Sequence, residues 1–258
     1  IQIRLVGSEM CIRDRYIVTG TDANGCSSSD TVNVFVNPLP AVDAGPASSI
    51  CLGDTAQLDA SGANSYNWSP SGSLSNAAIS NPLAFPTVST TYTVVATDTN
   101  GCVNTDSVVV TINSLPTASV SNDTTICVGD TATLVASGGT TYQWSPDSTL
   151  SNAFIAAPSA FPTLSATYQV IISDPNGCND TAEVTVTIQN LPTISAGVDQ
   201  TICVNDTTQL NASGGVTYGW TPANSLSATN IANPFAWPGG SSSYVVTGAD
   251  AIGCVFSD

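Results

Sequence analysis

Short runs of alternating apolar and polar residues dominate this chain. Ala56, Leu58 and Ala60 alternate with polar neighbours, which is the pattern of a strand buried on one face. The same period of two recurs over residues 92–96 and 108–112. No segment shows a helical period of useful length. The pattern therefore predicts an all-β protein built of short strands.

Turn signals separate these runs. Ser61-Gly62 closes the first run, and the Asp-Thr-Asn-Gly sequence at 98–101 lies between two longer ones. The glycine of such a turn supplies the positive φ that a tight hairpin needs. Tyr66 and Trp68 are two residues apart, so we expect both rings on one face of the strand that follows Ser61-Gly62.

The whole pattern recurs every 76 residues, without insertion or deletion, from Tyr16 onward. The period is read from Trp68, Trp144 and Trp220, from one tyrosine series, and from two cysteine series. We name the segments repeat 1 (16–37, the C-terminal hairpin of a truncated repeat), repeat 2 (38–113), repeat 3 (114–189) and repeat 4 (190–258, which lacks its last strand). A buried Trp on the third strand and a Tyr opening the sixth predict one immunoglobulin-like β-sandwich per repeat. A fixed period of this kind predicts a linear array.

Residues 1–15 do not belong to the repeat. They contain all three basic residues, Arg4, Arg13 and Arg15, together with the only methionine and the one cysteine off the repeat lattice, Cys11. They share nothing with the aligned segment 77–91. We interpret this segment as a non-native or artefactual leader resembling translated adapter sequence, and exclude it from the fold; a variable upstream loop is the alternative.

The charge balance removes whole classes of function. Residues 16–258 carry seventeen acidic side chains and no Lys, Arg or His. Such a surface repels nucleic acid, whose binding rests on cationic contacts to phosphate, and it repels anionic membranes. No apolar run is long enough to span a bilayer, so membrane insertion is not expected in this fragment.

Three segments of repeat 2 carry a family resemblance: AGPASSICLGDTAQLDASG, SYNWSP and TYTVVATDTNGCVNTDSVVVTI. They resemble the PKD-like, immunoglobulin-like tandem repeats of secreted surface proteins of Bacteroidota. The shared features are a Cys-x-Gly-Asp, a Tyr-x-Trp, a Tyr-x-Val strand and an Asn-Gly-Cys turn in fixed order. Repeat 4 departs twice, with Asn205 in place of the Gly and Ile252 in place of the Asn. The resemblance implies exported, adhesive or cell-wall-associated arrays on the bacterial surface.

The seven cysteines on the lattice predict a disulfide framework, because the Cys-x-x-Cys or His spacing of a zinc site is missing. They are Cys26, Cys51, Cys102, Cys127, Cys178, Cys203 and Cys254. Spacing alone suggests bridges within repeats: Cys51–Cys102, Cys127–Cys178 and Cys203–Cys254. The strand assignment places the two cysteines of one repeat at opposite ends of the sandwich, which favours bridges between consecutive repeats. Those bridges are Cys51–Cys178 and Cys127–Cys254, with Cys26 and Cys203 facing outward.

An Asp followed by Ser or Thr recurs along the chain and resembles the O-glycosylation pattern of Bacteroidota. The candidate acceptors are Thr31, Thr55, Ser107, Thr124, Thr131, Ser148, Thr181 and Thr207. The alternative is structural, since Asp favours turns and Thr favours strand starts.

The turn residues Asp22, Asp98 and Asp174 are weak calcium candidates. A calcium site takes six to eight oxygens, and one Asp with one Asn falls short of that number. An ordinary turn stabilised by the Asp side chain is the favoured interpretation. We expect no metal and no cofactor.

Catalysis is not expected. Without His, Lys or Arg in the repeats, a Ser-His-Asp triad, a Schiff base and an anion clamp are all excluded. Tyr66, Trp68 and their equivalents are interpreted as core, with a sugar-stacking platform as the alternative.

The sequence therefore predicts a structural or adhesive segment of an extracellular bacterial repeat protein: a stalk, an adhesin shaft or a filament. Its partners would be neighbouring repeats or copies of the same protein. The alternative is a set of carbohydrate-binding accessory modules of a secreted hydrolase, with surface polysaccharide as the partner.

Overall fold

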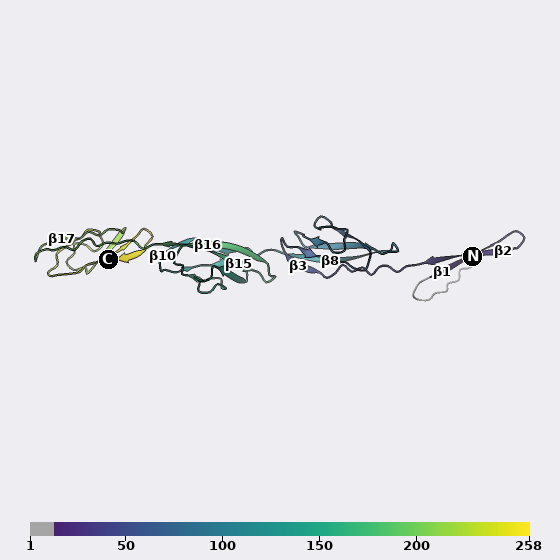
Figure 1. The fold of residues 1–258 in the computed structure, drawn as a ribbon, viewed down its shortest axis with the longest axis horizontal. Helices are drawn as coiled ribbons and strands as arrows, with labels where there is room; N and C mark the ends of the chain where they lie inside the picture. Colours follow the sequence, from purple (N-terminus) through teal and green to yellow (C-terminus); the bar gives the residue numbers. More distant parts are fainter. Residues whose placement is uncertain (1–12) are drawn as a thin grey trace. The chain divides into compact units, whose positions relative to one another are not determined.

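A computed structural model describes residues 13–258, so residues 1–12 of the predicted leader, including Arg4 and Cys11, lie outside it. The first hairpin joins β1 (Arg13–Thr21) to β2 (Ser27–Phe35) in antiparallel register. β1 begins three residues before the predicted start of repeat 1, so residues 13–15 are strand. Through the described chain there are strands and turns but no helix (Figure 1). The all-β prediction is confirmed.

Repeat 2 contains six strands. They are β3 (Ser48–Cys51), β4 (Ala56–Gln57), β5 (Ser65–Ser69), β6 (Leu83–Ala84), β7 (Thr90–Thr97) and β8 (Val103–Asn113). One sheet has the order β3-β8-β7-β5, and the opposing layer contains β4 paired with β6. The two layers enclose a single apolar core that includes Leu58, Trp68 and Tyr92. This is the predicted immunoglobulin-like sandwich.

Repeat 3 has the same plan with a longer second layer. Its strands are β9 (Ser119–Val120), β10 (Thr124–Cys127), β11 (Ala132–Thr133), β12 (Ala136–Ser137), β13 (Thr141–Ser145), β14 (Ser159–Ala160), β15 (Ala166–Ser173) and β16 (Asn179–Gln189). The main sheet runs β10-β16-β15-β13, and β9 pairs with β12 in the second layer. The equivalent of the β9–β12 pair in repeat 2 is a single bridge between Asp43 and Ser61.

One strand pairing was not predicted. β3 lies parallel to the second half of β8, and β10 lies parallel to the second half of β16 in the same register. The hydrophobic pattern gave no strand at residues 48–51, whereas Cys51 is the last residue of β3. This pairing matters because it fixes the cysteine at a known end of the main sheet.

A glycine at one lattice position permits close packing in each repeat. Gly62, Gly138 and Gly214 have φ between +89° and +117°. A Cβ built on any of them would lie 1.9 Å from the carbonyl oxygen of the chain entering the repeat. Only glycine allows both this backbone conformation and this close approach.

Repeat 4 is an open version of the same sandwich. Its strands are β17 (Thr208–Gln209), β18 (Thr217–Thr221), β19 (Phe235–Ala236), β20 (Val245–Ala249) and β21 (Val255–Ser257). The main sheet has three strands, β18-β20-β21, where repeats 2 and 3 have four. β21 has 3 residues at the lattice position where β16 has 11.

The described chain divides into two compact bodies, one that ends at residue 114 and one of residues 115–258. Repeats 3 and 4 belong to the second body, and the joint between them is described below. Residues 13–258 contain no helix that is long and apolar enough to cross a membrane.

Candidate functional site: the disulfide joint between repeats 3 and 4

The two cysteines of repeat 3 lie at opposite ends of one strand. Cys127 ends β10 and is in register with Gln189, the last residue of β16. Cys178 directly precedes Asn179, the first residue of β16. Eleven residues of extended strand separate these ends by roughly 33–37 Å. A disulfide needs Cα atoms within about 7 Å, so a Cys127–Cys178 bridge cannot form.

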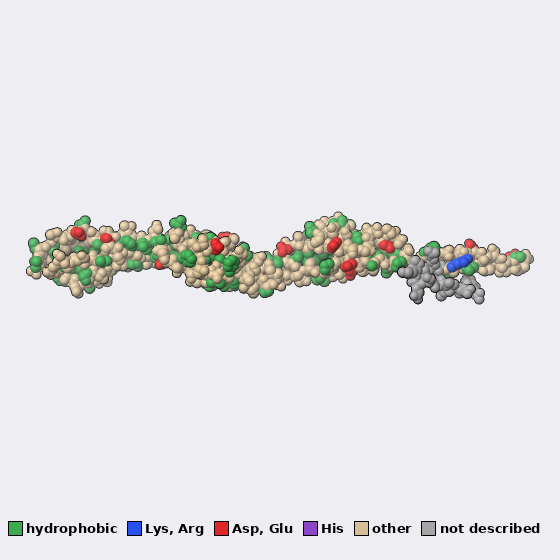
Figure 2. Space-filling view, turned by 60° about the horizontal axis from the view of Figure 1, so that its bottom comes forward, with side chains coloured by type: hydrophobic (Ala, Val, Ile, Leu, Met, Phe, Trp, Pro, Cys, Tyr) green, Lys and Arg blue, Asp and Glu red, His purple; other side chains and the backbone are tan. Residues whose placement is uncertain are grey.

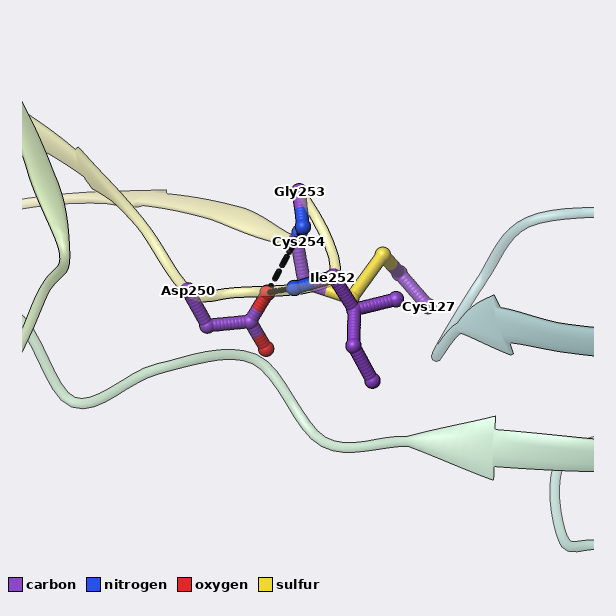
Figure 3. The surroundings of a disulfide bond; sticks show 5 residues. All are labelled: Cys127, Asp250, Ile252, Gly253 and Cys254. Atoms are coloured by element: carbon purple, nitrogen blue, oxygen red, sulfur yellow. Dashed lines mark hydrogen bonds between the residues drawn. A yellow bond between two sulfur atoms is a disulfide. The ribbon is translucent and has the colours of Figure 1, made fainter.

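The bridge that forms joins consecutive repeats. Cys127 of repeat 3 is bonded to Cys254 of repeat 4, with 5.5 Å between the Cα atoms (Figure 3). Cys254 is fully buried. It lies in the turn before β21, so the end of one sandwich is covalently tied to the hairpin turn of the next.

The turn that carries Cys254 is organised by one carboxylate. Asp250 Oδ1 accepts hydrogen bonds from the backbone N–H groups of Ile252, Gly253 and Cys254, each at 2.9 Å (Figure 3). The Gln189 side chain, from the end of β16, also donates to Asp250. Desolvation acts to raise the pKa of Asp250, but these hydrogen bonds outweigh it and hold the pKa below its ordinary value. The joint therefore combines a covalent bond with a polar contact between the two repeats.

Asp22, Asp98 and Asp174 occupy the equivalent turns. Each Oδ1 accepts the backbone N–H groups two and four residues later, at 2.8–2.9 Å. These three calcium candidates are therefore engaged as turn acceptors. The described residues contain no group of three or more His, Cys, Asp or Glu side chains placed to hold a metal ion.

Both sequence departures of repeat 4 fit this geometry. Ile252 keeps the backbone bond to Asp250 that the turn requires. Its counterpart Asn176 adds a side-chain bond to Asp174, 3.1 Å long, which isoleucine cannot make. Asn205 takes the place of a positive-φ glycine and itself has φ of 71°, a conformation that Asn tolerates better than most residues.

The remaining cysteines test the other predicted bridges. Cys26, Cys102 and Cys203 are free thiols. The bridges Cys51–Cys102 and Cys203–Cys254 are therefore wrong, for the geometric reason given for repeat 3. Cys51 and Cys178 are disulfide-bonded. Cys11 lies outside the described residues.

The glycosylation candidates lie mostly on the surface. The exposed hydroxyls are those of Thr31, Thr55, Ser107, Thr131, Ser148, Thr181 and Thr207, whereas Thr124 is half-buried. Some of the Asp residues that precede these acceptors form hydrogen bonds within the fold. Asp180 Oδ2 accepts the Ala118 N–H at 3.0 Å, and Asp106 accepts the Ala44 N–H at 2.8 Å. These bonds lower the pKa of both carboxyls, with further bonds from Thr181 and Ser107 and a smaller opposing effect of burial.

The aromatic residues separate into two sets. The rings of Trp68, Trp144 and Trp220 are buried, and each indole N–H donates to a backbone carbonyl at 3.0 Å. This confirms their assignment to the core. A second set was missed: Phe85, Phe161 and Trp237 occupy one lattice position and are 44–46% exposed. Their 76-residue spacing in the sequence was the signal that could have found them.

The surface holds scattered carboxylates rather than a concentrated charged site. Figure 2 shows the acidic side chains as small patches divided by uncharged surface. No polar or charged residue in the described part of the chain is fully buried.

No protein-family model and no curated protein sequence matches the chain. Similar solved structures include the N-terminal eight Ig domains of Down Syndrome Cell Adhesion Molecule, at 13% identity and a TM-score of 0.37, over 98% of this chain and 46% of that one. A Ca²⁺-stabilized adhesin with which an Antarctic bacterium binds ice has 12% identity and a TM-score of 0.37, over 95% and 80% of the two chains. Immunoglobulin domains 1–4 of Sidekick-1 have 12% identity and a TM-score of 0.29, over 95% and 81%. The immunoglobulin-like fold is shown by the strand order and register of repeats 2 and 3.

Proposed function

We propose that this chain is a structural and adhesive segment of an extracellular bacterial repeat protein: a stalk, an adhesin shaft or a filament, without catalysis. The observation that carries the proposal is the Cys127–Cys254 bridge, which ties one repeat to the next. A disulfide at this place limits how far two consecutive repeats can be pulled apart. Persistent disulfides are typical of oxidising, extracellular compartments.

The bridge makes a mechanical prediction. The chain between its ends spans 127 residues, whose extended length is roughly 430 Å. With the bridge intact, that length stays hidden when the chain is pulled from its ends. In a Cys51→Ser background, which removes the disulfide of Cys51, single-molecule force spectroscopy of the full chain should therefore show roughly 430 Å of additional extension after reduction or on addition of Cys254→Ser. Equal extension in both states would contradict a load-limiting role.

The surface chemistry supports an exported shaft. Acidic groups outside the leader have no cationic neighbours, so they favour solubility and oppose binding to nucleic acid and to anionic membranes. The exposed hydroxyls that follow Asp residues support O-glycosylation of the kind that the Bacteroidota resemblance implies. An intact mass of native material equal to that of the bare polypeptide would exclude this modification.

One observation favours the second candidate, a carbohydrate-binding accessory module. The exposed rings Phe85, Phe161 and Trp237 recur once per repeat, and exposed rings stack on sugars. Pull-down on insoluble polysaccharides separates the two functions. Binding that is lost in the triple Ala variant would support the accessory module, whereas a shaft should not bind. Thr133→Ala, at an exposed strand position, is a matched surface control.

A further inference from the structure

Three of the hairpin turns contain an asparagine followed by a glycine. They are the turns at Asn24-Gly25, Asn100-Gly101 and Asn176-Gly177. Both residues of each pair are exposed. In repeat 4 the same lattice position is occupied by Ile252-Gly253, so that turn lacks the side-chain amide. The chain therefore contains reactive turns and, in repeat 4, an internal control.

An asparagine followed by glycine can lose its side-chain amide without an enzyme. The glycine backbone nitrogen gives up its proton and bonds to the asparagine Cγ, the Cγ–Nδ2 bond breaks, and Nδ2 leaves as ammonia. Water then opens the resulting succinimide ring at either carbonyl, which leaves aspartate or isoaspartate. Glycine favours the first step because it has no side chain to shield its nitrogen.

The turns of repeats 2 and 3 hold the attacking nitrogen in the same way. The Gly101 N–H donates to the carbonyl oxygen of Asp98 at 3.2 Å, and the Gly177 N–H donates to that of Asp174 at 3.1 Å. The two glycines also have similar φ, +81° and +83°. In both turns this hydrogen bond must break before the glycine nitrogen loses its proton and attacks. The fold therefore slows the first step equally in the two repeats.

The two turns differ at the nitrogen that leaves. Asn176 Nδ2 donates to Asp174 Oδ2 at 3.1 Å, whereas Asn100 Nδ2 lies 3.5 Å from Asp98 Oδ2. The shorter distance is within the usual range for an N–H···O bond, and the longer one is outside it. A bond to an ionised carboxylate is stronger than a bond between neutral groups. The amide of Asn176 is therefore held by a bond that Asn100 makes only weakly.

We propose that Asn100 and Asn176 are sites of spontaneous deamidation, and that the carboxylate of Asp174 protects Asn176. In the folded chain Asn100 then converts roughly three- to tenfold faster than Asn176, which is the rate difference expected when one additional hydrogen bond must break.

Conversion of Asn176 changes a turn that carries a bonded cysteine. The product places a carboxylate where an amide donated to Asp174, and two like charges at this distance repel. Isoaspartate also lengthens the backbone by one methylene directly before Gly177. Cys178, the next residue, is buried and disulfide-bonded. Deamidation at this position therefore loosens the turn that presents the cysteine to its bridge.

The test follows the full chain during incubation at mildly alkaline pH. Samples are reduced, alkylated and cut with chymotrypsin, because residues 16–258 contain no Lys or Arg. Cleavage after Tyr and Leu, but not before Pro, places the two pairs in separate peptides, residues 93–134 and 169–210. Electron-based fragmentation assigns each converted residue and distinguishes isoaspartate from aspartate.

We expect conversion at residue 100 first and at residue 176 more slowly. Equal rates at the two residues in the folded chain would overturn the protection by Asp174. Conversion that is as fast at Asn104 and Asn179, which do not precede glycine, would overturn the assignment of the sites.

The unfolded chain separates the effect of structure from that of sequence. After reduction in denaturant, both turns are lost and the two Asn-Gly pairs should convert at similar rates. If Asn176 is slower by the same factor in the unfolded chain, its neighbours in the sequence set the rate and the proposed protection fails.

A matched pair of variants tests the protecting bond. Asp174→Asn keeps an oxygen for the backbone bonds of the turn but removes the acceptor of the Asn176 amide, so it should speed conversion of Asn176 roughly three- to tenfold. Asp98→Asn makes the same change of charge and should speed conversion of Asn100 less, because the bond there is already long. Equal acceleration in the two variants would assign the effect to charge and overturn the role of the bond.

A third variant identifies the source of the signal. Asn176→Ile copies the turn that repeat 4 forms around Ile252, so it should fold. Isoaspartate should then disappear from the peptide of residues 169–210. Isoaspartate that persists in this peptide would place the reactive residue elsewhere and overturn the proposal for repeat 3. The proposed shaft role does not depend on any of these outcomes.

Discussion

Repeats 3 and 4 carry equivalent core residues at equivalent lattice positions, yet they bury them differently. Leu134 and Tyr168 of repeat 3 are 0% exposed, whereas Leu210 and Tyr244 of repeat 4 are half-buried. Trp220 nevertheless stays buried, because β18 and β20 pair around it as β13 and β15 do in repeat 3. The comparison teaches that the core has two zones. The tryptophan zone lies at the β13–β15 pairing, and the leucine–tyrosine zone of repeat 3 shares its core cluster with Val184 and Val186 of β16.

The largest expected effect comes from truncating the leucine of each repeat. Leu134→Ala should cost about 2–5 kcal/mol, because it opens a cavity in a closed core. Leu210→Ala should cost less than about 1.5 kcal/mol, because that side chain is only half-buried and loses less burial. Both free-energy costs can be measured by chemical denaturation, with the unfolding of each repeat monitored by its hydrogen exchange. Equal costs would show that repeat 4 closes its core in solution.

Removal of the bridge should affect the two repeats unequally. Cys254→Ser frees a loop of 127 residues and should destabilise the joint by about 2–4 kcal/mol. We expect hydrogen exchange to rise more in repeat 4 than in repeat 3, because repeat 4 has the weaker core. Cys203→Ser, which changes an exposed free thiol, is the control and should alter neither repeat. An unchanged pattern of hydrogen exchange in Cys254→Ser would mean that the bridge forms because the two repeats are close together and does not stabilise them.

A glycine pair separates backbone strain from steric conflict. Gly138→Ala must displace the Thr117 carbonyl, 1.9 Å from the added Cβ, in addition to adopting φ of +117°. Gly129→Ala has a similar φ of +93° but nothing within 4 Å. The backbone term is about 1–3 kcal/mol in both, so Gly138→Ala should cost clearly more than Gly129→Ala in thermal denaturation of repeat 3. If the two substitutions cost the same, the backbone at Thr117 moves away from the added Cβ without a free-energy cost.

The sequence was most informative where period and residue type agreed. Alternation located the buried faces of β7 and β15, and the 76-residue lattice identified the buried tryptophans. The alternation of apolar and polar residues did not predict β3 and β10, because a four-residue strand with half-buried side chains lacks a distinct hydrophobic period. The contact of Gln189 with Asp250 was also missed, because it depends on how repeat 3 meets repeat 4, and a one-dimensional pattern does not encode that geometry.

The smallest expected effect concerns acid. The pKa of Asp180 is lowered in the folded chain, chiefly by the Ala118 backbone bond. A group with a depressed folded pKa contributes stability that is complete above its unfolded pKa, about 3.9, and is lost as the pH falls toward the folded value. Thermal melts of repeat 3 from pH 6 to pH 2.5 should therefore show a decline below about pH 4. Asp180→Asn retains an oxygen that can accept the Ala118 bond, so it should fold and flatten this decline. Asp130→Asn, on the exposed turn after β10, is the control and should keep the wild-type profile. A decline of equal size in Asp180→Asn would assign the acid sensitivity to the other carboxylates of the repeat.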